Sequence, residues 1–141
     1  MNKKDYHLFQ AAREAARNAD YSGANAVQIG CVAAYKGTIL AKGCNSDKTH
    51  PVQKQYNVLR YKDIGNNYLP EKIHAETDVI RRIKDLDIDK SKVHLYIYRE
   101  FKNGNLAPSR CCPSCIAMLR ASGIKHIHYT TQDGFAHEIL K

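Results

Sequence analysis

The chain has 141 residues, of which 43% are hydrophobic and 26% are charged, and its formal net charge at pH 7 is +8. This length supports one hydrophobic core, so we predict a single domain over residues 1–141. The composition excludes a disordered or fibrous protein, and the lack of a long apolar stretch or an apolar signal segment predicts a cytoplasmic protein with no membrane partner.

The first half of the chain predicts a helix, a hairpin and a long loop. Apolar residues recur at three- and four-residue spacings between residues 5 and 19, which predicts an amphipathic helix. Two β-rich runs, residues 28–35 and 38–44, are separated by Lys36-Gly37, and this arrangement is typical of an antiparallel hairpin. Periodicity fails over residues 46–72, so we predict a long loop of the kind that is usually functional or disordered.

The second half predicts two more helices, each followed by a strand. The helices are expected over residues 73–86 and 113–121, with Gly123 as a C-cap of the second. The strands are expected over residues 93–98 and 124–131. The order helix, hairpin, helix, strand, helix, strand predicts an α/β fold with a mixed sheet flanked by helices.

The cysteines point to a metal rather than to disulfides. The chain has five, and Cys111, Cys112 and Cys115 fall within five positions, which suits metal binding in a reducing compartment. Cys112-Pro113-Ser114-Cys115 is a C-x-x-C motif with proline at the expected first helical position. Both sulfurs then face the positive end of a helix dipole, which stabilises thiolates. Alone, this motif could equally be a redox site or half of a structural zinc site.

A third ligand is available in His74-Ala75-Glu76, at the start of the other helix. A catalytic zinc site typically has three protein ligands and a position for water. An H-x-E motif followed by C-x-x-C matches the zinc deaminase signature, in which the glutamate moves protons and does not bind the metal. The sequence therefore predicts a zinc site with His74, Cys112 and Cys115 as ligands and Glu76 as the catalytic acid and base.

These motifs resemble those of the cytidine and deoxycytidylate deaminase family, and the resemblance covers most of the chain. It implies a cytidine deaminase-like three-layer α/β/α sandwich with a mixed central sheet, a bound zinc and the roles given above for the four motif residues. It also implies that Asn45 and Ala75 bind substrate, Asn45 near the sugar, and that the protein is a homo-oligomer.

One position departs from the family pattern. The family usually has proline directly before the first cysteine of the motif, where this chain has Cys111. Pairing Cys111 with Cys115 gives an x3 spacing, and pairing it with Cys112 crowds adjacent sulfurs. We therefore favour Cys112 with Cys115 as ligands and expect Cys111 to be a spare thiol that oxidises easily.

The function favoured by these residues is hydrolytic deamination. Zinc makes hydroxide available at neutral pH, and Glu76 would carry protons while a cytosine-type base becomes uracil and ammonia leaves, with no organic cofactor. The favoured substrate is a small-molecule pyrimidine nucleotide such as dCMP, because histidine opens the first motif. The family's free-nucleoside branch usually has cysteine there.

Two other functions remain open. The net charge, the loop residues Tyr56, Arg60 and Tyr61, and the candidate phosphate contacts Arg99 and Arg110 would suit deamination within single-stranded DNA or RNA, or of tRNA adenosine or guanine. A non-catalytic zinc module that binds nucleic acid is the third reading, and it requires a fourth protein ligand.

Other histidines are weaker candidates. His126 and His128 alternate along the last predicted strand, a pattern that favours a polar sheet face over a metal pair. His50 with Cys44 could contribute to a second, structural zinc near the long loop.

Overall fold

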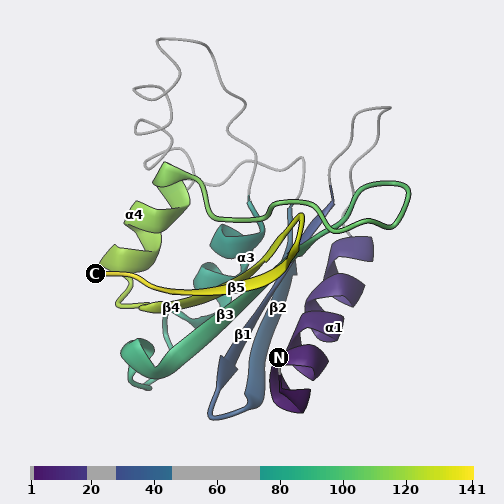
Figure 1. The fold of residues 1–141 in the computed structure, drawn as a ribbon. Coiled ribbons are helices and arrows are strands. Elements are labelled where there is room, and N and C mark those ends of the chain that lie inside the picture. Colours follow the sequence, from purple (N-terminus) through teal and green to yellow (C-terminus); the bar gives the residue numbers. More distant parts are fainter. Residues whose placement is uncertain (1, 19–27, 46–73) are drawn as a thin grey trace, which may run out of the picture.

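The computed structural model describes residues 2–18, 28–45 and 74–141 (Figure 1). In chain order, the elements in these ranges are helix α1 (Lys3–Arg17), strands β1 (Ile29–Tyr35) and β2 (Thr38–Cys44), helix α3 (Ala75–Ile83), a short 3-10 helix (Lys90–Lys92), strand β3 (Val93–Arg99), helix α4 (Pro113–Ala121), and strands β4 (His126–Thr131) and β5 (Gly134–Ile139). None of the described helices has the length and apolar character needed to cross a membrane.

The strands form one mixed sheet between helical layers. Their order is β2-β1-β3-β4-β5, with β3 and β4 parallel and the other neighbours antiparallel. Helix α1 covers one face of the sheet, whereas α3 and α4 lie on the other (Figure 1). This arrangement confirms the predicted three-layer α/β/α sandwich with a mixed central sheet.

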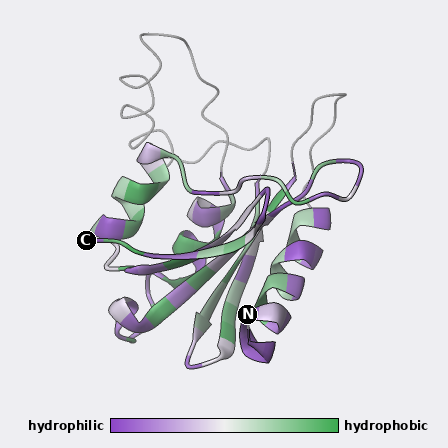
Figure 2. Cartoon of the chain, in the orientation of Figure 1, coloured by the Kyte–Doolittle hydropathy of each residue, from purple (hydrophilic) through white to green (hydrophobic). Residues whose placement is uncertain are grey.

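Alternation along the strands divides the core into two layers. Leu95 and Ile97 of β3 are buried with α3 and α4, while Tyr96 and Tyr98 of the same strand are buried with α1. Hydrophilic and hydrophobic stretches alternate along α1, as expected for a helix with one face on the sheet (Figure 2).

The predicted elements agree with the structure apart from their bounds and one strand. Helix α1 begins at Lys3 because the Asn2 side chain caps it, accepting a hydrogen bond of 2.7 Å from the Asp5 N–H. Helix α4 matches its predicted bounds, and Gly123 has the positive φ of 85° expected after a helix C-terminus.

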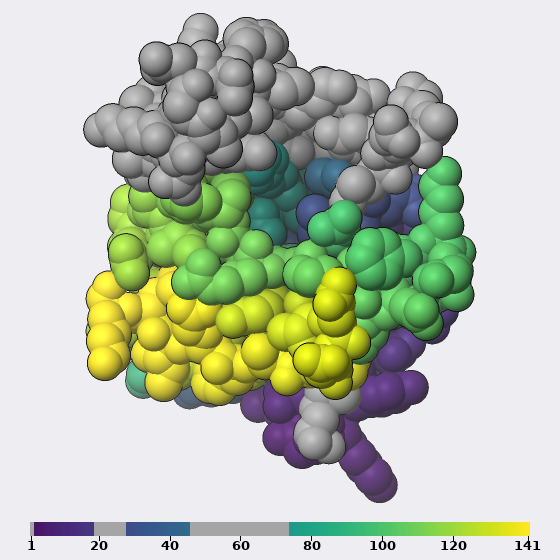
Figure 3. All heavy atoms as spheres, turned by 45° about the horizontal axis from the view of Figure 1, so that its top comes forward, coloured from purple at the N-terminus to yellow at the C-terminus, as the bar shows by residue number. Residues whose placement is uncertain are grey.

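Strand β5 was not predicted. It is an edge strand that pairs only with β4, and its residues alternate between half-buried and exposed. Its sequence, GFAHEI, has no continuous apolar run that would predict a strand. Figure 3 shows the last residues of the chain, in yellow, on the surface of the molecule, with the purple N-terminal residues below them. The predicted loop over residues 46–72 lies outside the described residues.

Close packing of α1 on β1 depends on a glycine. The helix presents Ala12 and Ala16 to the sheet, and a Cβ built on Gly30 of β1 would lie 1.9 Å from the Ala12 carbonyl oxygen and 2.5 Å from the Ala16 nitrogen. Both atoms belong to the helix backbone, so they cannot move aside as a side chain could. Gly30 therefore sets the distance between the first two layers.

We expect Gly30→Ala to lower the free energy of unfolding by about 3 kcal/mol, because α1 must move away from the sheet. Urea unfolding measures this change. Gly104→Ala is the control: a Cβ there meets no atom within 4 Å, and its positive φ of 88° adds a cost of only about 1 kcal/mol. Equal losses in the two variants would contradict the close contact between α1 and β1.

Candidate metal centre

The starts of α3 and α4 carry the two predicted motifs. His74 is the N-cap residue of α3 and Cys112 is the N-cap residue of α4. N-cap positions usually hold Ser, Thr, Asn or Asp, whose oxygen accepts a hydrogen bond from the first turn. Neither His74 nor Cys112 makes such a bond, and the two side chains face each other instead, with Cys112 Sγ 3.6 Å from His74 Nδ1.

Cys115 completes a group of three ligand atoms. It lies one turn into α4, and its Sγ is 3.2 Å from His74 Nδ1. The ligand atoms of His74, Cys112 and Cys115 all lie within 4.8 Å of one another. Tetrahedral zinc bonds place a sulfur and a nitrogen ligand about 3.6 Å apart. The observed separations therefore fit one zinc ion bound by an imidazole and two thiolates.

The Cys112 sulfur is prepared for metal binding by its surroundings. A hydrogen bond from Cys115 is the largest of the effects that lower the pKa of the Cys112 thiol to about 3, and bonds from His74 and Ser114 act in the same direction. The Ser114 hydroxyl is fully buried and 3.0 Å from Cys112 Sγ. Thiolate is the form of cysteine that binds zinc. In the sequence, Ser114 is distinguished only by its place inside the C-x-x-C motif, so this contact to Cys112 was not predicted.

Glu76 lies beside this group, in the first turn of α3. Its side chain is buried, and its Oε2 accepts a hydrogen bond of 3.4 Å from Cys115 Sγ. Burial raises the pKa of the Glu76 carboxyl above its usual value, although the nearby His74 acts in the opposite direction. A carboxyl group in this environment can both accept and return a proton.

The predicted substrate-binding residues lie on adjoining elements. Ala75 is the first residue of α3 and is buried. Asn45 follows β2, which is tied to α3 because the Cys44 N–H donates to Asp78 Oδ2 at 3.2 Å. The Asn45 side-chain oxygen accepts a hydrogen bond of 2.9 Å from the Ile29 N–H, which fixes the amide. Substrate binding by Asn45 and Ala75 stays a prediction.

Buried hydroxyl groups hold the segment that leads to Cys112. Thr130 of β4 donates to the Ala107 carbonyl oxygen at 2.7 Å. Ser109 Oγ donates to the Ile97 carbonyl oxygen of β3 at 3.0 Å and accepts from the Thr130 N–H at 2.9 Å. These bonds attach residues 107–109 to the ends of two parallel strands, three residues before Cys112.

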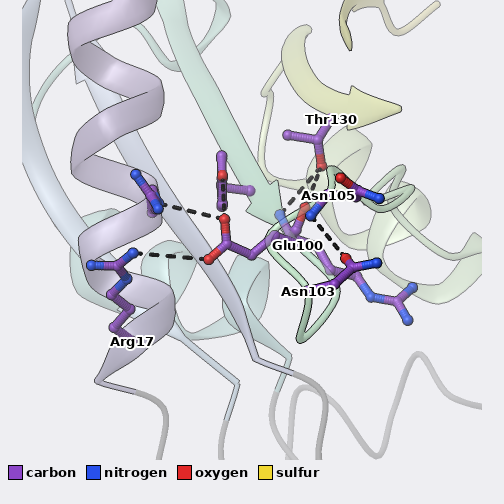
Figure 4. Close-up of polar contacts among 8 residues, drawn as sticks. Arg17, Glu100, Asn103, Asn105 and Thr130 are labelled. Carbon is purple, nitrogen blue, oxygen red and sulfur yellow. Dashed lines mark hydrogen bonds and ion pairs between the residues drawn. The ribbon is translucent and has the colours of Figure 1, made fainter. Parts of the chain in front are cut away.

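The start of the same segment is attached to α1. Glu100 follows β3, and its carboxylate forms ion pairs of 3.4 Å with Arg13 and 3.9 Å with Arg17 (Figure 4). The Tyr98 hydroxyl also donates to this carboxylate at 2.7 Å. Single Ser, Thr and Glu residues outside a motif gave no sequence signal for these contacts.

The structure also describes Cys111, which was expected to oxidise easily, and the candidate phosphate contacts Arg99 and Arg110. Phosphate contact by the two arginines stays a prediction. Cys111 is 4% exposed within the core, and burial raises the pKa of its thiol, so the expectation that it oxidises easily is wrong. Arg110 makes two hydrogen bonds of 2.9 Å to Glu138, and Arg99 donates to the Pro108 carbonyl oxygen. Four more candidates lie outside the described residues: His50, Tyr56, Arg60 and Tyr61.

Comparisons with known proteins agree with this geometry. A family model of the cytidine and deoxycytidylate deaminase zinc-binding region matches residues 2–131. The chain belongs to this family. It is thus related to hydrolytic deaminases, and the donor set of one imidazole and two cysteine sulfurs fits the metal for which the region is named. A search of curated proteins found no match.

Solved structures show the same fold. A dCMP deaminase from cyanophage S-TIM5 is 18% identical, with a TM-score of 0.58 over 92% of this chain and 84% of that one. A cytidine deaminase from Burkholderia pseudomallei is 15% identical, with a TM-score of 0.63 over 99% and 94%. RibD from Acinetobacter baumannii is 18% identical, with a TM-score of 0.54 over 90% of this chain and 28% of RibD.

We expect Cys112→Ser to reduce the thiolate-to-metal absorption of the cobalt-loaded protein, because one of two sulfur ligands is lost. Cys31→Ala is the control, since Cys31 is buried in β1 and lies outside the group of three ligand atoms. Its spectrum should equal that of the unmodified protein. An unchanged absorption in Cys112→Ser would show that Cys112 is no ligand.

Proposed function

We propose that the protein is a zinc-dependent hydrolytic deaminase that converts the cytosine-type base of a free nucleotide such as dCMP to uracil and releases ammonia. The observation that carries this proposal is the convergence of His74, Cys112 and Cys115 beside the buried carboxyl of Glu76. In this proposal a single domain over residues 1–141 acts in the cytoplasm, and it forms a homo-oligomer, as the family resemblance implies.

His74, Cys112 and Cys115 would hold the zinc. When bound, zinc supplies Lewis acidity that makes water a nucleophile near neutral pH. Glu76 takes a proton from the attacking water and gives it to the ring nitrogen of the base. It then carries the second water proton to the departing amine, so that the oxygen stays as the new carbonyl group and ammonia leaves.

The base would lie against the start of α3. N–H groups in the first turn of a helix have no partner within the helix, so the Ala75 N–H can donate to the carbonyl oxygen of the base. Asn45, held beside Ile29 at the end of β2, would contact the sugar. A base bound at these positions would have its reacting carbon near the Glu76 carboxyl, which lies in the same first turn of α3 as Ala75.

Two observations favour a free pyrimidine nucleotide. Histidine opens the first motif, where the free-nucleoside branch that the sequence resembles usually has cysteine. The dCMP deaminase of cyanophage S-TIM5, whose fold this chain shares at 16% identity, has been solved with dCMP and dUMP. The net charge of +8 would also attract single-stranded nucleic acid, so polynucleotides belong among the test substrates.

A non-catalytic zinc module is less well supported. It requires four protein ligands, whereas three residues form the group around His74 in the described ranges. A purely structural site would not need the buried Glu76 carboxyl, because burial of an ionisable group lowers the stability of the folded protein.

We expect Glu76→Gln to lower kcat for ammonia release about 10²- to 10⁴-fold, because the amide cannot carry protons. Zinc content should not change, since Glu76 is not among the three ligands. The assay measures ammonia released from dCMP, deoxycytidine, cytidine, guanine and single-stranded oligonucleotides.

Glu14→Gln is the control, because Glu14 is exposed on α1. It should release ammonia at the rate of the unmodified protein. If Glu76→Gln retains full activity, Glu76 is not the proton carrier, and the mechanism fails. If the protein deaminates an oligonucleotide faster than dCMP, its substrate is a polynucleotide and not a free nucleotide. The role of Glu76 in the mechanism is then unchanged.

A further inference from the structure

A second group of possible metal ligands, made of histidines, lies on the other face of the sheet from the His74 group. His94 in β3, His126 and His128 in β4, and His137 in β5 form what we call the histidine cluster. The strand registers pair His94 with His126 and His128 with His137. Strand alternation places all four on the α1 face with Tyr96, whereas the His74 group lies at the starts of the helices on the opposite face.

The ring nitrogens of the cluster converge. His94 Nδ1 is 2.8 Å from His128 Nε2, and the ligand atoms of His94, His128 and His137 all lie within 4.8 Å of one another. A tetrahedral zinc ion needs nitrogen ligands about 3.3 Å apart, and because the His128 and His137 rings are stacked with an interplanar angle of 2°, the exposed His137 ring must turn out of this stack to share an ion with His94 and His128. The fourth histidine, His126, is 3.1 Å from His137 through Nδ1 and stacks on His94.

The surroundings hold the ring of His128 in place. His128 is 6% exposed and lies between two parallel rings, with centroids 4.2 Å from both Tyr96 and His137. The Tyr96 hydroxyl donates to Asp5 Oδ1 at 2.6 Å, which ties this stack to α1. Packing against the Tyr96 ring restricts the rotation of the buried His128 ring.

The side chains of the cluster are a ligand type that suits a transition metal. Neutral imidazole is a common ligand of zinc, copper and nickel. Four of the seven histidines of the chain lie in the cluster, and one of them, His128, is buried, which is unusual for an ordinary polar sheet face.

A pocket of about 410 Å³ gives access to the cluster. His94, His128 and His137 line it together with Asp5 and three lysines, which are Lys4, Lys36 and Lys92. The lysines would repel a bare cation, but they would stabilise an anion bound to the metal as a further ligand. Three protein ligands leave such a position open.

We propose that His94, His128 and His137 bind a divalent transition-metal ion of the zinc, copper and nickel class, separate from the His74 centre. His126 acts as a positioning residue for His137. The open coordination position faces the pocket and takes water or a small anion such as phosphate. The alternation of His126 and His128 along one strand predicts only a polar face, because His94 and His137 join them through strand pairing that the sequence does not show.

The test uses full-length protein that is prepared without a polyhistidine tag and in which Cys112 and Cys115 are both replaced by serine. Zinc is titrated into the metal-free protein by calorimetry, and bound zinc is measured after dialysis. We expect about one zinc ion per chain to remain bound in this background. Adding His137→Ala, at an exposed position, should weaken binding at least about tenfold.

His7→Ala in the same background is the control, because His7 is exposed on α1 and outside the cluster. It should bind zinc as tightly as the background protein. His94→Asn is a second disruption, and circular dichroism confirms that each variant is folded. No zinc in the background protein, or unchanged affinity in both His137→Ala and His94→Asn, would overturn the proposal.

Cobalt separates this proposal from the proposed deaminase function. A metal bound only by imidazoles gives no thiolate-to-metal absorption, whereas the His74 centre does. The cluster should therefore take up cobalt in the double serine variant without that absorption. None of these readouts depends on catalysis, so a failure of the deaminase proposal leaves the result for the cluster unaffected.

Discussion

The site depends on the meeting of two helix N-termini at one edge of the sheet. Each helix uses its N-cap position for a residue that does not cap it, which costs about 1 kcal/mol relative to a good cap. The burial of Val79 and Leu119, together with Pro113 at the start of α4, offsets this cost. In return, the positive end of the α4 dipole lies at the Cys112 sulfur, where it favours the thiolate.

Contacts elsewhere in the fold fix the positions of these two helix starts relative to each other. Helix α3 is held on β2 by close packing, since a Cβ on Gly43 would lie 2.8 Å from Asp78 Oδ2. The segment before α4 is fixed by Thr130 and Ser109 across parallel strands. Helix α1 contributes from the opposite face, because its arginines hold Glu100 at the other end of that segment.

The sequence predicted the helices and most strands from local hydrophobic patterns, whereas the grouping of His74 with Cys112 and Cys115, 38 and 41 positions away, followed from the match of two short motifs to the zinc deaminase signature. Hydrophobic periodicity marks each helix, and each motif spans a few residues at a helix start. The histidine cluster could not be predicted in this way. It depends on the register of three strands, which brings His94 beside His128 across 34 positions, and on β5, an edge strand without an apolar run. The hydroxyl contacts of Thr130 are equally long-range.

Anomalous diffraction from crystals of the zinc-loaded protein, recorded at the zinc absorption edge, tests the central claim most directly. We predict a peak within about 2.5 Å of His74 Nδ1, Cys112 Sγ and Cys115 Sγ, with the Glu76 carboxyl beside it and not bonded to it. A disulfide between Cys112 and Cys115, or zinc found elsewhere and absent from these three atoms, would contradict the account.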